Sequence, residues 1–403
     1  MLSFIKICWL IIQILIGYNL VLPVLLFLLY RIKPVFQWRP AVLEQPGPDY
    51  AIIVTAYEQT DTLPAAVQAI LQMHYPHYLV YVVADKCDIS QLHFPDERII
   101  LLRPETVLAS NTRSHFYAIR HFRRPHTHLV IIDSDNIVDP ALLTELNKGF
   151  ASGFQAVQGE RKAKNLDTTY ACLDAARDIY YHFYDGRVLF GIGSSATLAG
   201  SGMAFTVSLY REALENTEVS GAGFDKVLQY QIVSKGHRIA FQGDAVVFDE
   251  KTSRPAQLVN QRARWINTWF RYFRFGFGLI GKGVSKPDWN QLIFGLVLLR
   301  PPLFLFLLAA AGCMFTDLLL GDFTAAWYWI AGWLFFILAF FISLAQSGTD
   351  KRILLSLWRI PAFVFYQVLS LRKVRKANKH SVATQHFHTD GMPIDHANKK
   401  DPA

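Results

Sequence analysis

The chain has 403 residues, of which 52% are hydrophobic and 14% aromatic, and its formal net charge is +8. Its length exceeds that of a usual single domain, and its apolar composition argues against an entirely soluble protein. The basic residues concentrate beside apolar segments, which is typical of loops that face anionic lipid and argues against nucleic acid as a partner.

The first predicted element is a transmembrane helix at residues 1–31. Residues 7–29 carry no charged side chain, and that length crosses about 30 Å of hydrocarbon. A secretory signal peptide is the alternative, but its apolar core would be shorter and would end in a small-residue cleavage site. The basic residues that follow indicate a cytoplasmic anchor. Residues 32–48 contain four prolines and are expected to form an extended linker.

Residues 49–283 are predicted to form one α/β domain that ends in an interfacial helix near residues 269–277. Alternating strands and helices imply a mostly parallel sheet with both faces covered, and such sheets bind ligands at the carboxyl ends of their strands. Thr55, Asp85 and Asp133 each follow or end an apolar run and are therefore expected on one edge of the sheet. Strands are expected at residues 50–55, 79–84, 99–102 and 129–132, and helices at 63–73, 114–122 and 141–150.

Two further transmembrane segments are predicted within residues 284–348. The segment at residues 292–320 is interrupted by Arg300-Pro301-Pro302, whereas residues 323–345 carry no charge. The loop between them has acids and no basic residue, so it is expected outside. Arg300 leaves open a second topology, in which the interrupted segment lies in the interface and the tail emerges on the opposite side.

The C-terminal part is basic and is expected on the cytoplasmic side. Residues 349–372 are predicted to lie in the membrane interface, and residues 373–403 to form a disordered tail. With three crossings, the α/β domain and the tail both face the cytoplasm. The predicted location is therefore the inner or plasma membrane, with a multi-pass topology.

Two motifs carry the chemistry. Asp133-Ser134-Asp135 follows an apolar strand, and two acids at a strand end form an oxygen-only site that suits Mg²⁺ or Mn²⁺ held against a diphosphate. Gln261-Arg262-Ala263-Arg264-Trp265 precedes membrane-like sequence, and an Arg/Trp pair suits phosphate and sugar surfaces. Together they resemble the membrane-bound family 2 glycosyltransferases, the group of cellulose, chitin-oligosaccharide and hyaluronan synthases. The resemblance covers residues 49–283 and implies a GT-A fold, which is Rossmann-like.

The resemblance implies a site for the nucleotide at the start of the domain. Thr55, Tyr57 and Glu58 stand in the opening strand and turn, where the family holds the base. Asp85 is the expected partner of the uracil N–H, although Ala84 departs from the pair of acids that is usual there. The donor is therefore expected to be a UDP-sugar.

The resemblance also assigns the diphosphate and its metal. Asp135 is expected to be the main ligand of Mg²⁺ or Mn²⁺, and Asp133 to contact the ribose or the metal. Arg264 would hold the diphosphate. The divalent ion would neutralise the leaving group as the sugar C1–O bond breaks.

The acceptor side is assigned in the same way. Gly200, Ser201 and Gly202 resemble the family's glycine-containing acceptor strand, while Gln261 and Trp265 would line the acceptor sugar site.

The expected general base is Asp225. It is the acid retained where the family usually has Glu-Asp, with Phe224 in place of the Glu. Inverting transfer needs one base for the acceptor hydroxyl, opposite the leaving group.

The sequence therefore predicts an inverting enzyme that adds sugar from a UDP-sugar to a growing β-linked polysaccharide. A single transfer to a lipid acceptor is the alternative, because three crossings leave little protein for a polysaccharide channel unless a second copy or a membrane partner adds helices. A catalytically silent membrane scaffold is less favoured, since Asp133, Asp135, Asp225 and Arg264 are all retained.

Overall fold

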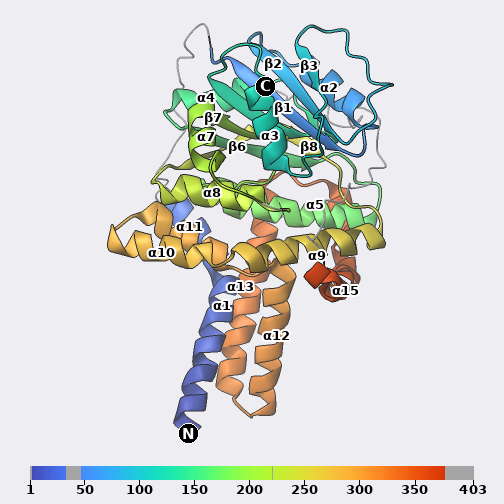
Figure 1. Ribbon diagram of the computed structural model, residues 1–403. Coiled ribbons are helices and arrows are strands. Elements are labelled where there is room, and N and C mark those ends of the chain that lie inside the picture. Colours follow the sequence, from blue (N-terminus) through green and yellow to red (C-terminus); the bar gives the residue numbers. More distant parts are fainter. Residues whose placement is uncertain (1, 33–46, 220, 377–403) are drawn as a thin grey trace, which may run out of the picture.

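The computed structural model describes residues 2–32, 47–219 and 221–376 (Figure 1). Most of the predicted linker and the predicted tail from residue 377 onward lie outside the described residues. The chain is built in three layers: a sheet with its covering helices, a layer of helices lying crosswise beneath it, and a stalk of three long helices (Figure 1).

One eight-stranded sheet organises the upper layer. Its spatial order is β3-β2-β1-β4-β7-β6-β8-β5, and β7 and β5 run opposite to the other six strands. The prediction of a mostly parallel sheet is confirmed, with a mixed edge that begins at β7. The strands are β1 (Tyr50–Tyr57), β2 (Tyr78–Asp85), β3 (Ile99–Leu102), β4 (His128–Asp133), β5 (Ile137–Val138), β6 (Ala156–Ala163), β7 (Met203–Thr206) and β8 (Ile239–Asp249).

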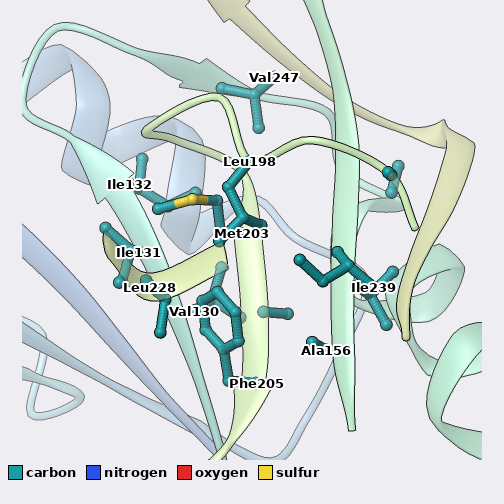
Figure 2. Close-up of a cluster of buried hydrophobic side chains, with 14 of the residues drawn as sticks. Val130, Ile131, Ile132, Ala156, Leu198, Met203, Phe205, Leu228, Ile239 and Val247 are labelled. Atoms are coloured by element: carbon teal, nitrogen blue, oxygen red, sulfur yellow. The ribbon is translucent and has the colours of Figure 1, made fainter. Parts of the chain in front are cut away.

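The core lies on both faces of the central strands. Val130 and Ile131 are consecutive in β4 and therefore point to opposite faces, yet both are at most 1% exposed. Figure 2 shows the side chains of β4 beside Met203 and Phe205 of β7, with Leu228 of a covering helix in the same cluster. Burial on both faces explains why these strands appear in the sequence as continuous apolar runs. The helices against the sheet include α2 (Leu63–Leu71), α3 (Asn111–Arg120), α4 (Leu142–Ala151), α7 (Val207–Leu214) and α8 (Phe224–Ser234).

The middle layer lies between the sheet and the stalk (Figure 1). A π-helical stretch, η1, continues α5 and leads into α6, and α9 carries the Gln-x-x-Arg-Trp motif. The interfacial helix expected near residues 269–277 is the end of α9 and the start of α10. The helices of this layer are α5 (Thr169–Tyr181), η1 (His182–Val188), α6 (Leu189–Gly191), α9 (Pro255–Tyr272), α10 (Phe275–Ser285) and α11 (Trp289–Leu299).

The stalk consists of α1 (Leu2–Ile32), α12 (Leu303–Leu319) and α13 (Phe323–Gln346). Asp317, near the end of α12 that lies away from the sheet, connects the three stalk helices. It is 1% exposed and accepts hydrogen bonds from Trp9 and Gln13 of α1 and from Trp329 of α13, at 2.8–2.9 Å. Buried polar groups of this kind hold apolar helices in register.

Three helices of the described chain are long and apolar enough to cross a membrane: Phe4–Ile32, Phe323–Gln346 and Lys351–Val374. The helices α11 and α12 pass the same test together but bend by 72° at Arg300-Pro301-Pro302. The segment predicted at residues 292–320 is therefore two helices, because the prolines cannot continue the hydrogen-bond ladder. Only α12 joins the stalk (Figure 1).

The basic C-terminal segment forms a helical unit, Lys351–Val374, at the place of the expected interfacial segment. The apolar residues 360–371 are too few to span a membrane by themselves. They form α15 (Ile360–Ser370), which follows α14 (Lys351–Ser356) after a single helical turn. This unit packs on α5 and α9 and not in the stalk (Figure 1).

Candidate functional site

A cavity of about 670 Å³ opens between the edge of the sheet and the middle layer, and we call it the central cavity. It collects residues from motifs that are far apart in the sequence. Of the predicted site residues, its lining includes Thr55, Tyr57, Asp133, Asp135, Gly200, Asp225, Gln261 and Trp265. Glu58, Asp85, Ser201, Gly202 and Arg264 are outside this lining.

Asp85 ends β2 and holds the loop that precedes α3. Its carboxylate is 2% exposed and accepts hydrogen bonds from the backbone N–H groups of Leu108 and Ala109, at 2.9 and 2.7 Å. Three residues around it, Glu58, Lys86 and Ala109, have φ values of 61°, 57° and 47°, which side-chain-bearing residues rarely adopt. Strained backbone persists only where the surroundings impose it, and it gathers at functional sites.

Asp133 and Asp135 stand at the carboxyl end of β4, facing the cavity. The N–H of Asp133 donates to the hydroxyl of Ser201 at 3.1 Å, and Ser201 is fully buried. Gly202 follows with φ 64°, and a Cβ there would lie 2.9 Å from Val247. The Gly-Ser-Gly turn thus supports Asp133.

These two carboxylates fit a hard divalent cation in their donor atoms. The described residues contain no group of three or more metal-ligating side chains. Phosphate oxygens of a bound nucleotide would have to complete the shell, as Mg²⁺ and Mn²⁺ sites at diphosphates require.

Asp225 lies in the first turn of α8, where the helix dipole favours a negative charge. Lys226 forms an ion pair with it at 3.0 Å and also donates to the carbonyl of Leu198. The turn depends on Gly223, which has φ 100° and lies so close to Thr268 that a Cβ would approach its methyl group to 2.6 Å. The contact fixes α8 against α9 and places Asp225 at the cavity.

Beneath the acids, buried ion pairs connect β6, α5, β8 and α9, and we call them the ionic network. Burial alone would raise the pKa of Asp178, but Arg177 and Lys251 outweigh it and hold that pKa well below its usual range. Burial lowers the pKa of Arg262 to about 10, with a further contribution from Arg177. Asp178 and Arg262 are therefore both charged at neutral pH. The members are Arg161, Asp174, Arg177, Asp178, Asp249, Lys251 and Arg262.

The Gln-x-x-Arg-Trp motif contributes differently from the expectation. Gln261 accepts a hydrogen bond from Thr252 at 3.0 Å. Arg262, an unassigned position of the motif, lines the cavity, whereas Arg264 does not. The guanidinium groups of Arg177 and Arg262 lie 4.1 and 4.2 Å from the ring centre of Trp265. These cations orient the ring and occupy space above it.

The cavity extends to the break between α11 and α12. Arg300 at this break is buried and pairs with Asp185 of the π-helical stretch, so the break is held to η1. Val297, Leu298, Leu303 and Phe304 supply an apolar lining here. Polar groups at the sheet and apolar groups at the stalk thus share one cavity.

Sequence reasoning missed Arg177, Arg262 and Arg300. Asp174, Arg177 and Asp178 have the i, i+3, i+4 spacing of one helix face, within a helix whose other side chains are largely apolar. That spacing was the available signal for a buried charged face.

A family model described as glycosyltransferase-like family 2 matches residues 46–268. Among solved structures, the chain is similar to the mannosyltransferase PcManGT from Pyrobaculum calidifontis in complex with GDP-Man and Mn²⁺, at 16% identity and a TM-score of 0.57. That alignment covers 91% of this chain and 98% of that one.

A weaker similarity is to S. aureus TarS 1-349 in complex with UDP, at 12% identity and a TM-score of 0.39, covering 58% of this chain and 65% of that one. No curated protein matches the chain.

Proposed function

We propose that this chain, which belongs to glycosyltransferase family 2 and has the GT-A fold, transfers sugar to an acceptor at a membrane. The proposed donor is a UDP-sugar. The observation that supports this most is the meeting of Asp133, Asp135 and Asp225 around one cavity, although nearly a hundred residues separate the two motifs.

The chemistry requires a donor held by its diphosphate and an acceptor hydroxyl aligned behind the sugar C1. Asp133 and Asp135 would hold Mg²⁺ or Mn²⁺, which neutralises the departing UDP. The acceptor oxygen forms a bond to C1, its proton passes to Asp225, and the C1–O bond to the diphosphate breaks with inversion. Thr55 and Tyr57 line the nucleotide end, with Asp85 shaping the loop beside it.

We place the enzyme in the plasma or inner membrane, with α1, α12 and α13 as the crossings. The catalytic domain and the C-terminal helical unit then lie on the same side, which we assign to the cytoplasm because UDP-sugars are made there. The crosswise helices of the middle layer would rest on the membrane surface.

The acceptor is either a growing polysaccharide or a lipid. The packing of the stalk helices favours a lipid acceptor. In the described residues these helices pack directly on one another, with Leu20 and Trp329 at most 5% exposed, so a polymer would need helices from a second copy or a partner to cross. The apolar end of the central cavity also adjoins the stalk, because Leu303 and Phe304 are the first residues of α12.

The test is transfer itself. Membranes that contain the full chain are incubated with a panel of radiolabelled UDP-sugars, and the product is extracted with organic solvent. Labelled product in the organic phase supports the lipid acceptor, and labelled polymer in the aqueous phase supports the polysaccharide. No product from any UDP-sugar, beside an active control transferase, contradicts the proposal.

A further inference from the structure

Several buried N–H groups around the central cavity lack partners in the described residues. Arg262 is 3% exposed, and its Nε and Nη1 make no hydrogen bond. The Nε of Arg177 is also buried without one, as is the indole N–H of Trp269. All three residues line the cavity. A buried donor without an acceptor is unfavourable. The guanidinium groups of Arg177 and Arg262 lie 4.1 and 4.2 Å from the ring centre of Trp265, so one acceptor in the cavity could serve both.

The chemistry of the donors indicates the sign of that acceptor. Arg177 and Arg262 share one carboxylate, Asp174, and Arg177 also pairs with Asp178, so two guanidinium groups stand close together. Because the unpartnered groups are guanidinium donors, a phosphate fits them in charge and geometry.

Arg177 and Arg262 lie in a different layer of the molecule from the expected metal ligands. Asp133 and Asp135 stand at the sheet, whereas Arg177 and Arg262 belong to α5 and α9 of the middle layer (Figure 1). Arg262 also lies 5.9 Å from the ring of Phe363, in the helix that packs on α9. Arg177 lies 5.8 Å from the ring of Tyr181, whose hydroxyl accepts a hydrogen bond from the N–H of Leu303. The pair therefore sits on the stalk side of the cavity, close to its apolar end.

We propose that Arg177 and Arg262 bind the phosphate of an anionic lipid acceptor whose head group carries a hydroxyl beyond that phosphate. The proposal rests on the transferase function above and names its acceptor class. The lipid tails leave past Leu298, Leu303 and Phe304 toward the stalk. The hydroxyl reaches Asp225, gives up its proton there, and bonds to the donor sugar as UDP departs.

The test measures lipid binding without any donor. The full chain in dodecyl maltoside is titrated with phosphatidylglycerol, or with galactosyl diacylglycerol, which has hydroxyls but no phosphate, and native mass spectrometry counts bound lipid. We expect saturable binding of phosphatidylglycerol that weakens about ten- to a hundredfold in Arg177→Gln and Arg262→Gln. Galactosyl diacylglycerol should bind more weakly, and equally to all variants.

Arg187→Gln is the matched control, because Arg187 lies outside the cavity lining and pairs with Glu160. It should bind phosphatidylglycerol as the wild type does. If the glutamine variants do not fold, Arg262→Lys decides, since it keeps the charge but loses the two-pronged geometry, and it should bind several-fold more weakly.

Equal binding of the two lipids, or unchanged phosphatidylglycerol binding in the Arg262 variants, would overturn the lipid site. So would a parallel loss of UDP binding, because the arginines would then belong to the donor. A wild-type chain that binds phosphatidylglycerol through these arginines and never binds UDP would support the lipid site and contradict the proposed donor site.

Discussion

At the scale of single residues, Asp135 carries the metal hypothesis. We predict that Asp135→Ala loses both turnover and the metal-dependent part of UDP binding, because the carboxylate expected to be the main ligand of the cation is then missing. Asp139→Ala is the control: Asp139 accepts a hydrogen bond from the N–H of Ala141 and is outside the cavity lining, so its loss should lower stability by about 1 kcal/mol and leave UDP binding intact. Titration of UDP with and without Mg²⁺ or Mn²⁺ measures this. Full activity in excess EDTA would refute the hypothesis.

The limits of sequence reasoning are also visible at this scale. Asp133, Asp135 and Asp225 could be located because each stands at the end or start of an element that the sequence reveals. Arg262 could not, since it lies two residues from Arg264 and hence about 200° away around the helix. Which arginine faces the cavity depends on how α9 is rotated. That rotation is set by buried Leu258, Ala263 and Ile266 against elements far away in the sequence.

At the scale of elements, the strands were the most predictable feature. A run such as Ile99–Leu102 is apolar, short and bounded by polar residues, and the structure gives it the predicted limits. The bend at Arg300-Pro301-Pro302 was visible as an interruption, but its 72° angle was not. The ion pair of Arg300 with Asp185 holds it, and no local pattern links two residues so far apart.

The turn before α8 gives a prediction for an element. Gly223 and Gly236 both have positive φ, at 100° and 87°, but a Cβ would clash with Thr268 and Tyr272 only at Gly223. Alanine at either position costs about 1–2 kcal/mol of backbone strain. Gly223→Ala should in addition push α8 from α9, displace Asp225 and lower transfer at least tenfold, whereas Gly236→Ala should keep its activity. Thermal unfolding and turnover of the two variants measure this, and equal turnover would contradict it.

At the scale of the whole molecule, the orientation of the stalk can be tested. Asp317 is buried by Trp9, Gln13 and Trp329 and does not act as an exposed loop charge. We therefore assign the cytoplasmic side of the stalk from the basic segment that begins at residue 351. We predict that an impermeant maleimide labels Leu319→Cys on intact cells. Lys286→Cys, in the middle layer, should react only after permeabilisation.

Both variants are made in a chain without its four native cysteines. Leu319 is 72% exposed at the far end of the stalk, and Lys286 is exposed as well, so access to the reagent depends on the side of the membrane. Labelling of Lys286→Cys from outside intact cells would reverse the assigned orientation.

Asp225 is the proposed general base of sugar transfer at the central cavity. The direct measurement is turnover of a radiolabelled UDP-sugar by Asp225→Asn beside the wild type, with UDP affinity determined in the same samples. Loss of a general base should lower the rate by about 10²–10⁴-fold while UDP affinity stays near the wild-type value. Turnover by Asp225→Asn at the wild-type rate would contradict the account.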